Sequence, residues 1–142
     1  MIGIIGAMDE EVEQIVAVMD IEREETKAQM TFKAGKLAGK DVVIVRSGIG
    51  KVNAAVCTQI LVDDFGVDYV INTGIAGSLK NEINIADIVI SDDVLHHDMD
   101  ATGFGYAPGQ IPRMDTLSFK ADAKLIELAK EKPKPEFNFQ EA

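Results

Sequence analysis

Residues 3–12 read GIIGAMDEEV, and this stretch decides which class of fold the chain can adopt. An apolar strand closes at Gly6, and after a short turn three acids, Asp9, Glu10 and Glu11, begin a predicted helix. A glycine turn between a strand and a helix usually holds an anion, because backbone N–H groups and the helix dipole both point toward it. Here carboxylates crowd that place, so the sequence raises the question of what this turn binds.

Strand-like and helix-like hydrophobic patterns alternate along the chain, which predicts an α/β fold with helices flanking a central sheet. Strand patterns cover residues 2–6, 28–47, 67–74 and 86–94. Helical patterns cover residues 9–19, 51–65 and 120–131.

Three details of these elements can be predicted as well. Asp9 is a candidate cap for the first helix, and Ala38–Lys40 is a candidate turn of a hairpin within residues 28–47. The helix over residues 51–65 is apolar around most of its circumference, so we expect it to be well buried and to end at Gly66.

Composition restricts the possible partners. The 142 residues carry a net charge of -10 without a basic run, which argues against nucleic acid and anionic membranes and favours a small neutral or cationic ligand. A single cysteine, Cys57, forms no internal disulfide, and no Cys/His cluster has metal-ligand spacing. With no export signal and no membrane span in the sequence, we expect a cytoplasmic protein without metal or cofactor.

Three predicted strands end in turns of small residues. These are IIGAM (4–8), VRSGIGK (45–51) and INTGIAG (71–77). In an open α/β sheet the ligand binds outside the carboxyl ends of the strands, where glycine lets the backbone come close. The three ends therefore predict one shared pocket.

Each turn also has a less specific interpretation. The first lacks G-x-G-x-x-G spacing, so we reject a dinucleotide site, and its acids can simply stabilise the helix dipole. The second lacks the full P-loop pattern despite Lys51. The third suits edge-on hydrogen bonding to a flat ligand but equally suits a tight strand-to-loop turn.

Residues 96–112, HHDMDATGFGYAPGQIP, lie mostly within a predicted loop over residues 97–116. Two His and two Asp suggest a metal site, but neighbouring side chains on an extended segment point apart, which argues against it. Phe104, Tyr106 and Pro112 on a glycine-rich loop indicate a flap at an interface or over a ligand.

Four motifs, in this order, closely resemble the bacterial 5'-methylthioadenosine/S-adenosylhomocysteine nucleosidases of the purine nucleoside phosphorylase superfamily. They are GIIGAMDEEV (3–12), SGIGKVNAA (47–55), NTGIAG (72–77) and HHDMDATGFGYAPGQIP (96–112). The resemblance covers residues 1–130 and leaves residues 131–142 as a divergent tail. It implies a mixed sheet flanked by helices, as in purine nucleoside phosphorylase, a nucleoside substrate, no cofactor and release of adenine by hydrolysis in methionine salvage.

The resemblance also assigns roles to residues. Glu11 matches the glutamate that activates water, while Asp9 and Glu10 are interpreted as structural. The implied substrate-binding positions are Met8, Ile49, Ile75, Ala76, Gly77, Phe104 and Pro112. Phe104 and Pro112 match residues that reach the neighbouring subunit's pocket, which implies a homodimer whose loop 97–116 reaches the partner's site.

The residue chemistry agrees with hydrolysis. Breaking an N-glycosidic bond builds a cationic sugar in the transition state, which a carboxylate such as Glu11 can stabilise while it holds water. A phosphorylase needs a cationic or amide-only cradle for phosphate, and residues 3–22 contain neither Lys nor Arg. The alternatives are a phosphorylase or another nucleoside hydrolase, and an inactive nucleoside-binding or oligomeric protein.

The sequence departs from the family in two ways. Ile75 stands where many relatives carry a hydroxyl that supports the catalytic aspartate. Nothing in residues 117–142 matches the general-acid aspartate or the ribose-binding glutamate, so the chain looks like the N-terminal portion of such an enzyme. We therefore expect little or no nucleosidase activity from this chain alone.

Overall fold

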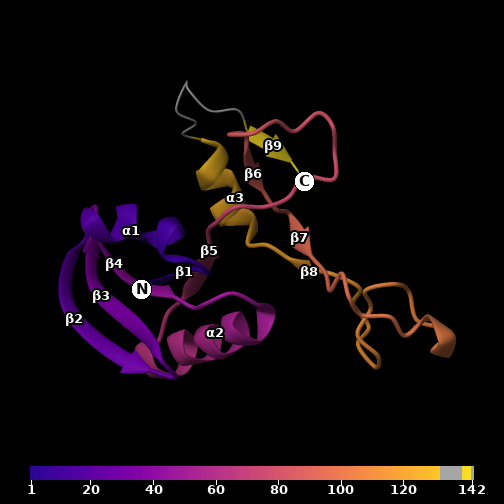
Figure 1. Ribbon diagram of the computed structural model, residues 1–142, viewed down its shortest axis with the longest axis horizontal. Helices are drawn as coiled ribbons and strands as arrows, with labels where there is room; N and C mark the ends of the chain where they lie inside the picture. Colours follow the sequence, from indigo (N-terminus) through magenta and orange to yellow (C-terminus); the bar gives the residue numbers. More distant parts are fainter. Residues whose placement is uncertain (132–138, 142) are drawn as a thin grey trace. The chain divides into compact units, whose positions relative to one another are not determined.

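The apolar strand at the start of the chain, β1 (Ile2–Gly6), lies inside a five-stranded sheet (Figure 1). The structure is a computed structural model that describes residues 1–131 and 139–141. It contains two compact units, Met1–Gly77 and Ser78–Ala142, and each is described by itself.

In the first unit β1 is followed by α1 (Asp9–Ala17), β2 (Asp20–Lys27), β3 (Met30–Leu37), β4 (Lys40–Arg46), α2 (Lys51–Phe65) and β5 (Tyr69–Asn72). The strands are ordered β2-β3-β4-β1-β5. β1 pairs in parallel with β4 and β5, whereas β2, β3 and β4 form an antiparallel meander. The prediction of a mixed sheet flanked by helices is confirmed.

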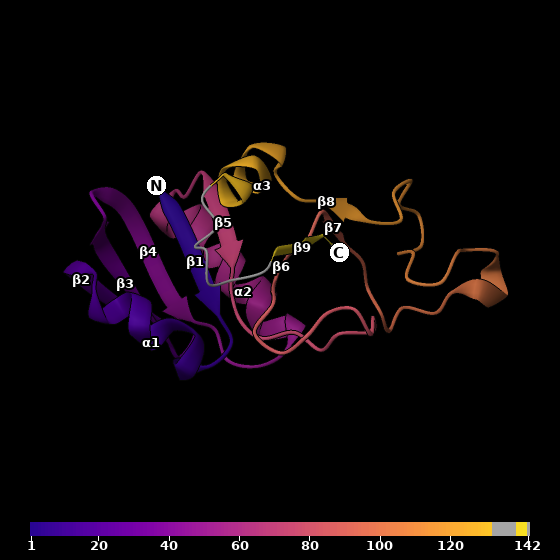
Figure 2. The same cartoon turned by 90° about the horizontal axis from the view of Figure 1, so that it is seen from above.

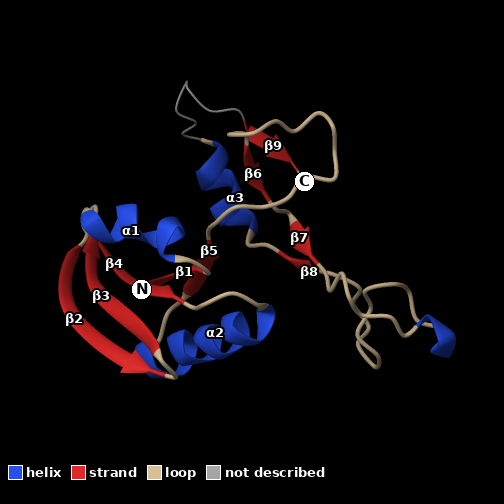
Figure 3. Cartoon of the chain, in the orientation of Figure 1, coloured by secondary structure: helices blue, strands red, loops and turns tan. Residues whose placement is uncertain are grey.

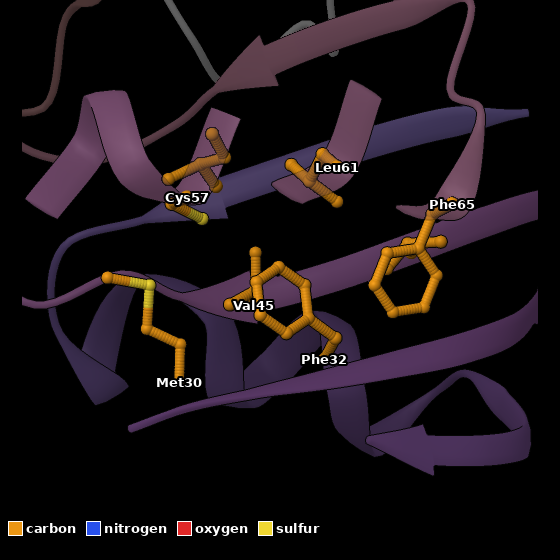
Figure 4. Close-up of a cluster of buried hydrophobic side chains, with 8 residues drawn as sticks. Met30, Phe32, Val45, Cys57, Leu61 and Phe65 are labelled. Carbon is orange, nitrogen blue, oxygen red and sulfur yellow. The ribbon is translucent and has the colours of Figure 1, made fainter. Parts of the chain in front are cut away.

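Alternate residues of the central strands point to opposite faces of this sheet, and a helix covers each face (Figure 3). Ile4 and Ile44 pack toward Val12 of α1. On the other face a second core cluster joins the sheet to α2, with Ile5, Met30, Phe32, Val43, Val45, Cys57, Leu61 and Phe65 as its members (Figure 4). Continuously apolar strands such as VVIV in β4 are required by this two-sided burial.

The helix α2 has the predicted bounds and ends at Gly66, which adopts the left-handed conformation (φ 62°, ψ 40°) that favours glycine. The prediction that α2 is well buried is wrong. Only Cys57, Leu61 and Phe65 are buried, because a single face of the helix meets the sheet. Ile60 is partly buried against the same cluster, whereas Val52, Val56 and Val62 face outward, and Val52 is 73% exposed.

The predicted hairpin is confirmed as β3 and β4. The sequence did not reveal β2, the third strand of the antiparallel meander. β2 carries almost only charged and polar residues, so it lacks the alternation that marks a half-buried strand. It nevertheless pairs with β3 through a turn at Ala28 and Gln29, both at positive φ. Its charged side chains suit the edge of a sheet, where they discourage pairing with other chains.

The first helix differs from the prediction at both ends. It ends at Ala17 rather than at residue 19, although Met19 is buried all the same. The N-cap is Met8, with extended backbone, and Asp9 is already the first helical residue. Asp9 is therefore not the cap.

The second unit contains β6 (Ile88–Ile90), β7 (Asp93–Val94), a 3-10 turn (Thr102–Phe104), β8 (Phe119–Lys120), α3 (Ala123–Lys130) and β9 (Phe139–Glu141). β6 pairs in parallel with β9, and β7 pairs antiparallel with β8. The single strand predicted over residues 86–94 is thus divided between two partners. α3 starts later than predicted, because the Asp122 side chain caps it by accepting a hydrogen bond from the Leu125 N–H at 3.0 Å.

Most of the tail predicted over residues 131–142 lies outside the described residues, which resume only at β9. In the part of the chain that the structure describes, no helix is both long and apolar enough to cross a membrane.

Candidate active site

The turns after β4, β1 and β5 lie side by side at the carboxyl ends of these strands. The three strands are parallel neighbours with β1 in the middle, so their carboxyl ends lie together, and we call this end of the sheet its carboxyl edge (Figure 2). The pairing continues into the turns, where the Ser47 N–H donates to the Gly6 carbonyl and the Thr73 N–H donates to the Ile5 carbonyl, both at 2.9 Å. The tertiary structure thus brings together the three segments that the sequence singled out.

The carboxylate of Glu11 joins two of these turns. Its Oε2 accepts hydrogen bonds from the backbone N–H groups of Ala7 at 2.6 Å and Met8 at 3.0 Å. Its Oε1 accepts one from the backbone N–H of Ile75 at 3.0 Å. Three amide donors that could hold an external anion are therefore occupied by a side chain of the protein itself.

These contacts determine the charge of Glu11. The hydrogen bond from the Ile75 N–H lowers the pKa of the Glu11 carboxyl below its ordinary value, partial burial opposes this, and the Met8 and Ala7 N–H groups lower the pKa further. Near neutral pH the side chain is a carboxylate.

The other two acids of the first helical turn have different surroundings. Asp9 Oδ1 lies 2.9 Å from Nε of Arg46, at the end of the neighbouring strand, and both side chains are largely exposed. Glu10 is exposed to solvent. Glu11 is the acid to which the turn after β5 donates a hydrogen bond.

The turn after β4 is held by a side chain from the helix that follows it. Asn53 Nδ2 donates to the Ile49 carbonyl at 2.8 Å, and the buried Ser47 hydroxyl donates to the Gly48 carbonyl at 2.9 Å. The Ile49 side chain is left 74% exposed. It offers an apolar surface on a turn whose backbone is fixed.

The turn after β5 presents backbone and an apolar side chain. Ile75 contributes its N–H to Glu11, whereas its side chain is 84% exposed. Ala76 and Gly77 are exposed as well. The side chain at position 75 takes no part in the hydrogen bond to Glu11, since the donor belongs to the backbone.

The remaining predicted site residues lie in the second unit. Phe104 ends the 3-10 turn and is 87% exposed, and Pro112 is exposed farther along the same loop. Within the first unit, Met8 and the turns after β4 and β5 lie at the same end of the sheet as Glu11.

The predicted loop also contains the His and Asp residues that suggested a metal. Asp100 Oδ1 accepts hydrogen bonds from the hydroxyl and the N–H of Thr102, at 2.7 and 3.0 Å. Across residues 1–131 and 139–141, no group of three or more His, Cys, Asp or Glu side chains is arranged to hold a metal ion.

Sequence reasoning missed two contributors to the site. The Ala7 N–H contacts Glu11, and the position of Ala7 directly before the helix N-cap was a usable signal, because the N–H groups at a helix start lack partners within the helix. Arg46 pairs with Asp9 only because β1 and β4 are adjacent, and no local pattern indicates that.

Comparison with known proteins adds a family to this geometry. The family model described as the phosphorylase superfamily matches residues 1–139. A 5'-methylthioadenosine/S-adenosylhomocysteine nucleosidase of Marinomonas sp. (strain MWYL1) is 54% identical over 129 residues, which cover 91% of this chain and 55% of the relative.

Two solved structures of such nucleosidases are also similar. The enzyme of Neisseria meningitidis in complex with methylthio-immucillin-A matches with a TM-score of 0.93 and 39% identity, over 99% of this chain and 61% of the other. The enzyme of Colwellia psychrerythraea 34H in complex with adenine matches with a TM-score of 0.92 and 43% identity, over 99% and 59%. The chain thus spans little more than half the length of the proteins it matches.

Proposed function

This chain belongs to the phosphorylase superfamily, and we propose that its protein hydrolyses the N-glycosidic bond of 5'-methylthioadenosine and S-adenosylhomocysteine and releases adenine. The similarity to nucleosidases of this name, one of them in complex with adenine, supports this substrate class. The reaction adds water to C1' of the ribose, while the C1'–N9 electron pair and a proton go to the base. We assign it to methionine salvage in the cytoplasm, which suits a chain whose one thiol, Cys57, is free and buried.

One observation carries the proposal, namely the carboxylate of Glu11 held by three backbone N–H groups at the carboxyl edge of the sheet. Oε2 accepts two hydrogen bonds and Oε1 accepts one, so Oε1 keeps a lone pair that can accept a hydrogen bond from water. We propose that Glu11 orients the attacking water through this lone pair.

The lowered pKa of Glu11 defines its role more closely. A weakly basic carboxylate does not readily remove a proton from a neutral water molecule. It does stabilise the positive charge of the sugar, and it accepts a proton from the water once that water has bonded to the cationic sugar. Glu11 therefore suits a dissociative hydrolysis, in which the sugar becomes cationic before water attacks.

The same hydrogen bonds favour hydrolysis over phosphorolysis. Phosphate would need the amide donors after β1, and the Ala7 and Met8 N–H groups are already bonded to Glu11. A dianion beside this carboxylate would also be repelled. Water, a small neutral nucleophile, meets neither obstacle.

The apolar and backbone groups around Glu11 suit the rest of a nucleoside. We assign Met8 and Ile49 to the ribose and the 5'-alkylthio group, and the backbone of Ile75, Ala76 and Gly77 to the purine edge. The exposed apolar side chains of Ile49 and Ile75 support this assignment, because a thioether and a purine face both gain from apolar contact.

We further propose a homodimer in which loop 97–116 of one chain closes the site of the other. Its support is the exposure of Phe104 and Pro112 on a glycine-rich loop, since exposed aromatic residues on loops mark interfaces and lids. We propose no residue of this chain as the general acid that protonates adenine. We accordingly expect the 142-residue chain alone to release adenine slowly or not at all.

Binding tests this proposal without relying on turnover. We expect isothermal titration calorimetry to detect methylthio-immucillin-A, a probe known from the Neisseria complex, binding to this chain. Glu11→Gln should weaken that binding, whereas Glu10→Gln, which removes the same charge one residue away on an exposed side chain, should not. Any adenine released from methylthioadenosine should be independent of phosphate. Absence of binding, or base release that requires phosphate, would contradict the proposal.

A further inference from the structure

Gly74 lies between two residues of the turn after β5 that are tied to the first strand and helix. On one side the Thr73 N–H donates to the Ile5 carbonyl at 2.9 Å. On the other side the Ile75 N–H donates to Glu11 Oε1 at 3.0 Å. The backbone at Gly74 therefore passes directly beside the carboxylate of Glu11.

The space above Gly74 is filled by that carboxylate. A Cβ atom added to Gly74 would lie 2.3 Å from Glu11 Oε1, 2.6 Å from its Cδ and 3.0 Å from its Oε2. All three are atoms of the one carboxyl group. Since the backbone of Gly74 lies outside the left-handed region that side chains avoid, the Glu11 carboxyl is the nearest obstacle to a side chain here.

We propose that Gly74 is a positioning residue, whose missing side chain admits the Glu11 carboxylate to the Ile75 N–H and so holds it at the edge shared by β1 and β5. This inference rests on the proposed role of Glu11 in orienting water. Gly74 touches no reacting atom and acts only through Glu11.

A positioning role and a purely structural role for Gly74 predict different effects of Gly74→Ala. The carboxyl group is the far end of a flexible side chain, so an alanine at position 74 can push it aside while the strand and turn stay in place. If Gly74 positions Glu11, the substitution therefore changes the surroundings of Glu11 with little loss of stability. If the turn itself needs glycine, the substitution lowers stability whatever residue stands at position 11.

The first test measures the titration of Glu11 by NMR of its carboxyl carbon in Gly74→Ala. We expect the pKa of Glu11 to rise toward its ordinary value, because the Ile75 N–H lowers it most, and the Ile75 amide signal should cease to titrate with Glu11. Gly77→Ala is the matched control, since a Cβ there meets no atom within 4 Å. It should leave the pKa of Glu11 unchanged. An unchanged pKa in Gly74→Ala would overturn the inference.

A double-mutant cycle keeps the inference testable if Gly74→Ala also lowers stability. Urea unfolding is compared for Gly74→Ala in the natural chain and in the Glu11→Ala background, where the carboxyl group is gone. We expect the shift of the unfolding midpoint to disappear in that background. A shift of equal size in both backgrounds would assign Gly74 to the turn and refute the positioning role.

Neither test needs turnover, so the two proposals fail separately. If Glu11 responds to Gly74→Ala but the chain binds no methylthio-immucillin-A, the positioning role stands and the proposed function falls. If the chain binds that probe and Glu11 does not respond, the proposed function stands and the positioning role falls.

Discussion

The backbone N–H of Ile75 donates a hydrogen bond to Oε1 of Glu11 at 3.0 Å, across 64 positions of sequence. This contact joins the turn after the edge strand β5 to the first turn of α1. It is also the largest cause of the lowered pKa of Glu11. One hydrogen bond thus couples the folding of the sheet edge to the charge of the proposed catalytic group, and the coupling has measurable effects.

Acid should remove the stability that Glu11 provides. The folded-state pKa of Glu11 lies below the ordinary value of 4.5, so its contribution is complete above that value and is lost as the pH falls through the folded-state pKa. We expect the natural chain to exceed Glu11→Gln in urea midpoint at about pH 7 and the difference to shrink toward about pH 3. A difference that stays constant with pH would contradict this linkage.

Two neighbouring residues of α2 should differ sharply in their effect on stability. Leu61 is fully buried between the helix and the sheet, whereas Val62 is 47% exposed. Leu61→Ala should lower the free energy of unfolding by about 2–5 kcal/mol, because it removes apolar contacts and leaves a cavity. Val62→Ala should change it by less than about 0.5 kcal/mol. Chemical unfolding of both variants measures the contrast, and equal effects would show that the helix packs differently.

Cys57 should resist alkylation in the folded chain. Burial raises the pKa of its thiol to about 11, so only about a thousandth of it is thiolate at about pH 8. We expect iodoacetamide to react far faster after unfolding in urea. Val62→Cys combined with Cys57→Ser places the thiol on the exposed face of the same helix as a control. Equal labelling rates in the two folded proteins would contradict the burial of Cys57.

The proposed exchange of loops between two chains can be tested with a spin label. Phe104→Cys carries the label, while the buried Cys57 is expected to stay unlabelled. Chains that carry the spin label but no ¹⁵N are mixed with ¹⁵N-enriched chains that carry no spin label. We expect selective broadening of the Met8 and Ile49 amide signals, because the label would lie in the partner's site.

In the reference sample one chain carries both the ¹⁵N and the spin label. It is diluted with an excess of the natural chain, which carries neither. Broadening of Met8 and Ile49 in this sample together with none in the mixed sample would refute the exchange. The loop would then fold back on its own chain.

Much of this fold follows from local sequence. The alternation of apolar strands and helices predicted the α/β class, because a strand buried on both faces needs the continuous apolar run seen in β4. Gly66 fixed the end of α2, since it adopts the left-handed conformation that other residues avoid. The small-residue turns after β1, β4 and β5 marked the edge where the proposed site lies, and the resemblance selected Glu11 from its three acids.

Other features depend on contacts between distant segments, and only the tertiary structure decided them. β2 is a strand because β3 offers it backbone partners, not because of its own composition. α2 is apolar on most sides, yet only the face that meets the sheet is buried. Asp9 pairs with Arg46 and Glu11 bonds to Ile75 because the order β4-β1-β5 sets their turns side by side. Local sequence therefore determined most of the elements and where the acids stand, while strand order determined that the Ile75 N–H reaches Glu11.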